Sequence, residues 1–183
     1  MIRTLSWILA GAIMVSGCAG PIQTRGQTQQ LASAPETRKF KIVPAESLDN
    51  RELVLGRALV AESLRKLGYQ SAPDASILVH VALSDRPAAI AIDAGGKNDA
   101  RRIAEAKRHK QFQSCRDREH RLAVSLFDQA KGKQLYSGSA AEYHCKGTIA
   151  QSLPFLVATA LSDLDRDPTD FPQDFVQFRR GVE

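Results

Sequence analysis

The chain has 183 residues, with 25 lysines and arginines against 20 aspartates and glutamates, which gives a formal net charge of +5 at neutral pH. It shows no internal repeat and only one shift in composition, near residue 37, which argues against a repeat protein or several domains. The stretch from about Arg38 to Glu183 is long enough to bury one core of its own.

The first residues have the pattern of a secretory signal peptide. Arg3 precedes an apolar run, Leu5 to Val15, that is too short to cross a bilayer, for which a helix needs about 20 apolar residues. The stretch Val15-Ser16-Gly17-Cys18 that follows closely resembles the lipobox of bacterial lipoproteins. This resemblance implies that residues 1–17 are removed and that Cys18 receives a diacylglyceryl group and an acyl chain such as palmitate. The alternative is an ordinary signal peptide with a chance cysteine.

The resemblance also implies a location. Ala19, rather than aspartate, follows the cysteine, which by the sorting rule of enteric bacteria favours the periplasmic face of the outer membrane. Between Cys18 and Thr37 only Ile22 and Leu31 are sizeable apolar residues, so residues 18–37 are predicted to form a disordered tether. Such a coil would hold the domain roughly 25 Å from the lipid.

The remaining chain, residues 38–183, is predicted to form one domain that begins with a strand, Lys39 to Val43. A helix follows, with Asp49 as its N-cap, Glu52 as the capping-box partner and Gly68 as its left-handed C-terminal residue. The apolar run Ile77 to Leu83 is predicted to be a buried central strand.

The second half begins with an insertion, residues 84–120, in which a helix is predicted from about Asp99 to Gln111. Two strands, residues 122–127 and 134–144, form a hairpin in which Gly132 takes the left-handed position. A closing helix follows Ser152 as N-cap. This order predicts an α+β fold, a two-layer sandwich of about four mostly antiparallel strands with two helices on one face.

Several short motifs resemble a family of bacterial envelope lipoproteins that is known only as a domain of unknown function. They are Phe40 to Pro44, Leu64 to Tyr69, Ala75 to Val79, and Leu126 to Gly138. The resemblance implies an envelope location and a small α+β fold. It provides no catalytic residues and no cofactor.

Cys115 and Cys145 are predicted to form a disulfide, because a short loop between Asp128 and Gly132 would bring them opposite each other on the hairpin. Such a bridge could add roughly 2–4 kcal/mol of stability. One alternative is a pair of free thiols, and another is a zinc site of both cysteines with His120 and His144. Zinc is disfavoured because adjacent strand residues point to opposite faces.

Other candidate sites have simpler interpretations. His80 is expected to be a hydrogen-bonded, buried or half-buried histidine rather than a catalytic base. Asp163, Asp165 and Asp167 alternate like a calcium loop, but Pro168 stands where that loop needs glycine, which favours a solvated helix end.

The insertion carries an excess of positive charge. Its candidate anion-binding patch consists of Arg101, Arg102, Lys107, Arg108 and Lys110. In the envelope, the available partners are lipopolysaccharide phosphates or an acidic protein, whereas nucleic acid is not expected there. The alternative is a solvated loop without a ligand.

The leading hypothesis is therefore a non-catalytic, lipid-anchored envelope protein that binds or supports another envelope component. An envelope enzyme is the alternative, although the sequence has no Gly-x-Ser-x-Gly, His-Glu-x-x-His or phosphate-loop motif. A thiol–disulfide function is a third, but the two cysteines are not a Cys-x-x-Cys pair.

Overall fold

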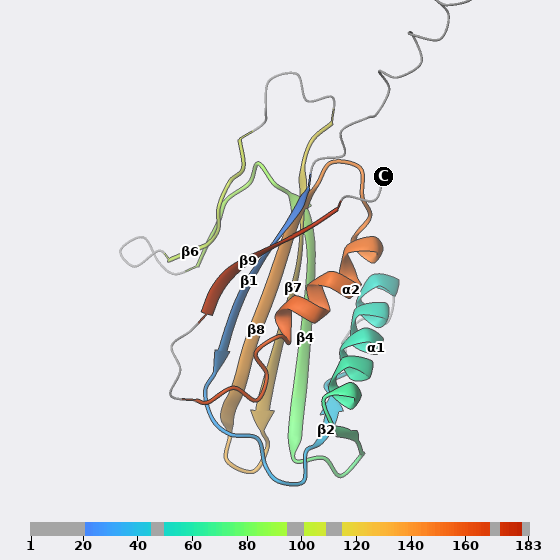
Figure 1. Cartoon of the computed structure of the whole chain (residues 1–183), viewed down its shortest axis with the longest axis vertical. Helices are drawn as coiled ribbons and strands as arrows, with labels where there is room; N and C mark the ends of the chain where they lie inside the picture. The colour runs from blue at the N-terminus through green and yellow to red at the C-terminus, as the bar shows by residue number, and fades with distance from the viewer. Residues whose placement is uncertain (1–20, 45–49, 95–100, 109–114, 169–172, 181–183) are drawn as a thin grey trace, which may run out of the picture.

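The computed structural model describes residues 21–44, 50–94, 101–108, 115–168 and 173–180. The main sheet has seven strands in the order β3-β2-β4-β7-β8-β1-β9, and a separate small sheet pairs β5 with β6. Both helices lie on the same side of the main sheet (Figure 1). The elements are β1 (Ile22–Gln30), β2 (Lys39–Ile42), α1 (Arg51–Lys66), β3 (Gln70–Ser71), β4 (Ile77–Pro87), β5 (Ile92–Ala94), β6 (Arg101–Ala104), β7 (Arg118–Asp128), β8 (Lys133–His144), α2 (Ile149–Ala160) and β9 (Gln173–Arg179).

The predicted sheet of about four mostly antiparallel strands is wrong. The sheet is mixed. β2 pairs in parallel with both β3 and β4, whereas the other neighbouring pairs of the sheet, β4 with β7, β7 with β8, β8 with β1 and β1 with β9, are antiparallel. The parallel pairing follows from the connection, since a strand can pair in parallel with the next one only through a long crossover, and α1 provides it between β2 and β4.

The predicted tether is also wrong over most of its length. Residues Ile22–Gln30 form β1, a strand that lies between β8 and β9. The strand residues that face the helices are Thr24, Gly26, Thr28 and Gln30. All four are buried, and none has an apolar side chain. Composition therefore gave no sign of a buried strand, because hydrogen bonds rather than apolar burial hold this segment.

The first helix largely agrees with the prediction. Gly56, Val60 and Leu64 form its buried face, and Gly68 has φ +86° immediately after the helix. The N-cap is Asn50 instead of Asp49, which lies outside the described residues. The Asn50 side chain accepts a hydrogen bond from the backbone N–H of Leu53 at 2.9 Å.

The closing helix begins earlier than predicted. Thr148, not Ser152, is the N-cap, and it forms a capping box with Gln151. Pro154 consequently lies inside α2. The mistaken N-cap matters for the site, because the Ser152 side chain is free to point into the layer between helix and sheet.

The hairpin strands agree with the prediction, and Gly132 in their turn has φ +62°. The insertion does not, because residues 101–104 form β6 instead of a helix. Within it, Arg86 donates from its guanidinium to the carbonyl oxygens of Pro87 and Ile90, which ties the start of the insertion to the end of β4.

The core lies between the helices and the middle of the sheet. Its fully buried members come from both helices and from β2, β4, β7 and β8, and they include Phe40, Val60, Leu64, Ile77, Val79, Leu122, Leu126, Leu153 and Leu156. At Gly138 an added Cβ would overlap the carbonyl oxygen of Ala160, so glycine permits the end of α2 to approach β8. Among the described helices, none is long and apolar enough to cross a membrane.

Candidate functional site

One end of the main sheet gathers most of the unusual side chains, and we call it the proximal end. There β1 begins, β4, β8 and β9 end, and β7 begins (Figure 1). The register places Pro87 opposite Arg118, Arg118 opposite His144, and Ile22 opposite Arg179. The opposite end, which includes the turn between β7 and β8, is the distal end.

A buried polar network fills the proximal end between the sheet and α2. Its members are all less than 10% exposed and come from four elements: Thr24, His120, Glu142, His144 and Ser152. The side chains meet because residues that alternate along a strand share one face, and β7 and β8 place His120 opposite Glu142.

The Ser152 hydroxyl connects the two histidines. Its Oγ lies 2.8 Å from Nδ1 of His120 and 3.0 Å from Nε2 of His144. The two imidazole rings are stacked, with centroids 4.7 Å apart and an interplanar angle of 15°. One arrangement of protons satisfies these atoms: His144 Nε2–H donates to Ser152 and to Glu142, and Ser152 donates to His120.

Glu142 is the buried anion of this network. Its carboxylate accepts hydrogen bonds from Thr24 Oγ1 at 2.5 Å, from Arg179 Nη2 at 2.8 Å and from His144 Nε2 at 2.7 Å. Burial by itself raises the pKa of Glu142, but the hydrogen bonds from His144, Arg179 and Thr24 outweigh it and lower the pKa to about 2. Glu142 is therefore ionised at neutral pH.

His120, unlike Glu142, is favoured in its uncharged form. Burial, followed by the neighbouring His144 ring, lowers the pKa of His120, against the weaker effects of Asp85 and Glu142. Its Nε2 lies 3.8 Å from Asp85 Oδ1. The network thus holds His120 in its neutral form.

The combination of serine, histidine and glutamate is that of a catalytic triad, but the geometry differs. In a triad the histidine uses one ring nitrogen for the serine and the other for the carboxylate. Here both Ser152 and Glu142 contact the same Nε2 of His144. His120 has Ser152 at its Nδ1, but the carboxylate near its Nε2, that of Asp85, lies 3.8 Å away, beyond hydrogen-bond distance. Ser152 is also fully buried. This arrangement therefore does not present the hydroxyl as a nucleophile to a substrate.

A second charge cluster lies on the face of the sheet turned away from the helices. The fully buried Glu119 forms ion pairs with Arg25, Arg86 and Arg121. Tyr143, its neighbour on β8, lies between two cations, with Arg25 4.2 Å and Lys107 4.6 Å from the ring centroid. A recess of about 410 Å³ adjoins this cluster, and its charged or polar lining residues are Arg25, Gln27, Glu105, Arg121, Ser139 and Asp174.

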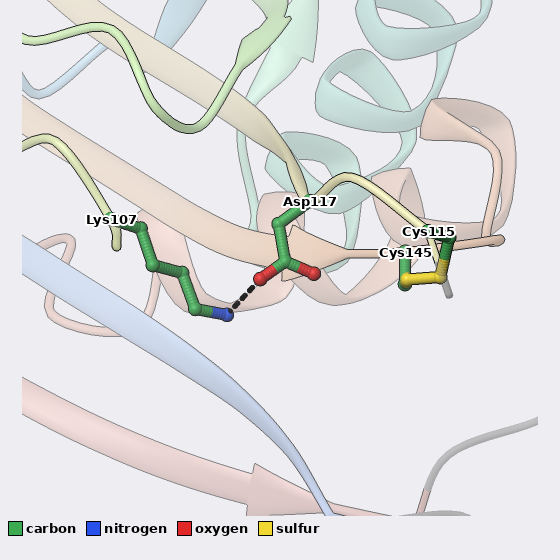
Figure 2. Close-up of a disulfide and its surroundings, with 4 residues drawn as sticks. All are labelled: Lys107, Cys115, Asp117 and Cys145. Carbon is green, nitrogen blue, oxygen red and sulfur yellow. Dashed lines mark ion pairs between the residues drawn. A yellow bond between two sulfur atoms is a disulfide. The ribbon is translucent and has the colours of Figure 1, made fainter. Parts of the chain in front are cut away.

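The predicted disulfide is present. Cys115 and Cys145 are bonded, with their Cα atoms 5.6 Å apart, just beyond the paired ends of β7 and β8 (Figure 2). Lys107 forms an ion pair with Asp117 at 2.6 Å in the same region (Figure 2). The bridge uses both sulfurs that the zinc alternative requires. The described part of the chain contains no group of three or more histidine, cysteine, aspartate or glutamate residues that could hold a metal ion.

A second recess, of about 600 Å³, lies in the insertion at the proximal end. Its apolar lining consists of Pro87, Ala88, Ala89 and Ile90, and its charged lining consists of Lys107, Arg108, Arg116 and Asp117. Lys107 is paired with Asp117, whereas Arg108 and Arg116 are exposed and have no ion pair among the described residues. This recess therefore joins an apolar surface to two guanidinium groups that have no ion-pair partner in the described part of the chain.

The structure places the residues of the predicted anion-binding patch in different elements. Lys107 and Arg108 line the recess, Arg101 and Arg102 belong to β6, and Lys110 lies outside the described residues, as does Cys18. Arg116, directly after Cys115, belongs to the same basic insertion but was not part of the predicted anion-binding patch.

Two further predictions can be compared with the structure. His80 is exposed, because β4 is covered by helices on one face only, so the prediction of a buried or half-buried histidine is wrong. Asp163 and Asp165 bind neighbouring elements: Asp163 accepts from Thr28 at 2.5 Å, and Asp165 accepts from Tyr69 at 2.7 Å.

The buried network itself was missed in the sequence. Thr24 lies in the segment expected to be a tether, and Ser152 was assigned to a helix cap. Two signals were available: Glu142 and His144 stand at alternate positions of a strand, which places both on one face, and the zinc alternative grouped His120 with His144, whose rings stack in the structure.

Comparisons with known proteins leave the family open. No family model matches the sequence, and no curated protein does either. A PDZ domain protein from Parabacteroides distasonis is similar in structure over 85% of this chain, with a TM-score of 0.54 and 8% sequence identity. This chain spans only 39% of that protein, so the likeness supports the mixed-sheet fold alone.

PelC from Paraburkholderia phytofirmans, solved as a dodecamer, is similar over 78% of this chain and 98% of its own, with 15% identity and a TM-score of 0.47. A variant of that dodecamer is similar over 79% of this chain and 99% of its own, with 16% identity and the same TM-score. Similarity at this level is too low to support an argument about function.

Proposed function

We propose that the chain is a non-catalytic, lipid-anchored protein of the bacterial cell envelope. In this proposal it is attached through Cys18 to the periplasmic face of the outer membrane, where it binds or supports another envelope component.

The observation that carries the proposal is the stretch Val15-Ser16-Gly17-Cys18 behind a short apolar run. Only a cysteine provides the sulfur needed for a thioether-linked lipid. Stable attachment to a membrane takes more than one acyl chain, and a cysteine at a new N-terminus can carry lipid on both its sulfur and its amine.

The disulfide supports the proposed compartment. Disulfides persist in oxidising compartments such as the periplasm and are rare in the cytosol. The Cys115–Cys145 bridge joins the ends of two paired strands, a position that suits a structural bond rather than a reactive one.

The geometry of the buried network supports a non-catalytic role. Ser152 is covered by the fold, and His144 directs one nitrogen to both of its partners. Asp85 lies 3.8 Å from the Nε2 of His120, too far for a hydrogen bond that would orient this ring. Nucleophilic catalysis needs an accessible hydroxyl and a base that a third group orients from its other side.

Mass spectrometry of the chain isolated from bacterial membranes tests the proposal. We expect a protein that lacks residues 1–17 and carries a diacylglyceryl group and an acyl chain at Cys18. The variant Cys18→Ala should abolish incorporation of labelled palmitate, whereas the matched variant Cys115→Ala should retain it. An unmodified Cys18, or a leader that remains attached, would overturn the proposal.

A further inference from the structure

The distance between the proposed lipid and the folded domain is short. Only residues 19–21 separate Cys18 from Ile22, the first residue of β1. A fully extended chain spans at most about 3.6 Å per residue, so the sulfur-bearing residue lies within roughly 14 Å of the sheet. A lipid at Cys18 would therefore hold the proximal end close to the bilayer surface.

The proximal end carries positive charges that the described residues do not neutralise. Four exposed basic residues there have no ion pair among the described residues: Arg108, Arg116, Lys146 and Arg180. Arg118 and Arg179 are also at this end but pair with Asp85 at 2.6 Å and with Glu142 at 2.8 Å.

The position of these four residues follows from the sheet register. Arg180 follows Arg179, which lies opposite Ile22, and Lys146 follows the end of β8. Arg116 precedes the start of β7, and Arg108 follows Lys107, whose N–H donates to the carbonyl oxygen of Ala88 just beyond β4. All four therefore lie at the same end of the sheet as the start of β1.

Exposed apolar side chains accompany the free cations. Ile90, which lines the recess with Arg108 and Arg116, is 55% exposed, and Phe178, next to Arg179 on β9, is 69% exposed. Basic groups beside exposed apolar groups are typical of surfaces that rest on a bilayer, where the cations meet lipid phosphates and the apolar groups enter the boundary of the acyl region.

We propose that the proximal end binds the surface of a phospholipid bilayer that contains anionic headgroups. Arg108, Arg116, Lys146 and Arg180 contact the lipid phosphates, and Ile90 and Phe178 contact the acyl boundary. The inference rests on the proposed attachment at Cys18 for its orientation, and it adds a second, electrostatic contact that fixes which end of the domain faces the membrane.

Vesicle binding by unlipidated protein tests the surface separately from the anchor. The chain from residue 18 with Cys18→Ser retains every described element and cannot carry the lipid. We expect it to cosediment with phosphatidylcholine vesicles that contain phosphatidylglycerol, but not with pure phosphatidylcholine vesicles. Raising the salt concentration should weaken the binding, because salt screens exposed charges.

Charge reversal locates the surface. The double variant Arg108→Glu/Arg116→Glu should reduce the affinity for anionic vesicles by at least about tenfold. The matched variant Lys131→Glu/Lys133→Glu reverses the same charge at the distal end and should have little effect. A second proximal pair in other segments, Lys146→Glu/Arg180→Glu, should cause a similar loss of affinity for anionic vesicles. Circular dichroism checks that each variant is folded.

Three results would overturn the inference. These are no binding to anionic vesicles, equal loss in the proximal and distal variants, or binding to soluble lipopolysaccharide or an acidic protein without binding to phosphatidylglycerol vesicles. Because the vesicle experiment uses protein without lipid, its failure is distinct from the absence of lipid at Cys18 in the cell, which mass spectrometry detects.

Discussion

The two ends of the sheet are built differently although the same strands run through both. On the face toward the helices, β7 carries His120 at the proximal end and Leu126 at the distal end. β8 likewise changes from His144 and Glu142 to Tyr136. The distal end is stabilised by apolar burial, whereas hydrogen bonds between buried polar groups organise the proximal end.

Exposed cations that have no ion pair among the described residues occur at both ends, and Lys133 is one at the distal end. At the distal end, Arg38 pairs with Asp165 at 2.9 Å, Arg166 pairs with Asp163 at 2.5 Å, and Lys39 pairs with Asp74 at 3.0 Å. At the proximal end, four exposed cations have no ion pair among the residues that the structure describes. The membrane contact that we propose uses the unpaired cations of the proximal end, because that end lies nearest the proposed lipid at Cys18.

The largest effect that we expect comes from the buried carboxylate. Glu142→Ala leaves Arg179 and His144 without their acceptor, and removing one partner of a buried ion pair costs about 3–5 kcal/mol. Urea denaturation measures this change. The control Glu62→Ala removes a carboxylate whose pair with Lys66 is exposed, and it should change the free energy of unfolding by no more than about 0.5 kcal/mol. Similar losses in both variants would contradict the account of the proximal end.

Removal of the disulfide should have the next largest effect. The double variant Cys115→Ala/Cys145→Ala should lose about 2–4 kcal/mol, because the bridge restricts the unfolded chain. Hydrogen exchange distinguishes the two ends. Amides of Arg118 and His120, near the bridge, should exchange faster than in the wild type by a larger factor than the amide of Leu126. Uniform acceleration along β7 would show that the bridge does not stabilise the proximal end in particular.

A smaller effect is expected for the hydroxyl that connects the histidines. Ser152→Ala leaves His120 Nδ1 without its hydrogen-bond partner, and an unsatisfied buried polar group costs about 1–3 kcal/mol. Ser139→Ala, on the face away from the helices, provides a matched control, and its free energy of unfolding should remain near that of the wild type. If Ser152→Ala is neutral, the network is not a stabilising unit.

The smallest expected effect is a dependence on pH. Because the pKa of His120 is lowered in the folded protein, the unfolded chain binds its proton first as the pH falls. The stabilisation is complete above the unfolded pKa of about 6.5 and decreases below it, by at most about 1.4 kcal/mol per pH unit. His120→Gln should flatten the stability profile between about pH 7.5 and about pH 5.5. An unchanged profile in His120→Gln would exclude this origin.

The sequence predicted the elements whose apolar residues follow a regular period. The buried face of α1, the strand from Ile77 and the hairpin strands on either side of Gly132 were all predicted. β1 and β9 were missed, since the buried face of β1 is polar and β9 exposes Val176 and Phe178. Pattern recognition depends on apolar burial, so it fails where hydrogen bonds take that role.

The site could be predicted only in part for the same reason. The disulfide followed from hairpin pairing, because Cys115 and Cys145 lie just beyond the ends of adjacent strands. The histidine–serine network depends on α2 crossing the end of the sheet, and no local pattern specifies that placement. The proposal that the proximal end faces a membrane likewise required the register that places Ile22 beside Arg179.

Orientation on the membrane tests the central claim most directly. Lipidated protein would be reconstituted into vesicles that contain nitroxide-labelled lipid, with a fluorophore attached either at Lys146→Cys, near the proximal end, or at Lys131→Cys, in the distal turn. We predict strong quenching of the fluorophore at position 146 and little at position 131. Equal quenching at both positions, or stronger quenching at position 131, would contradict the account.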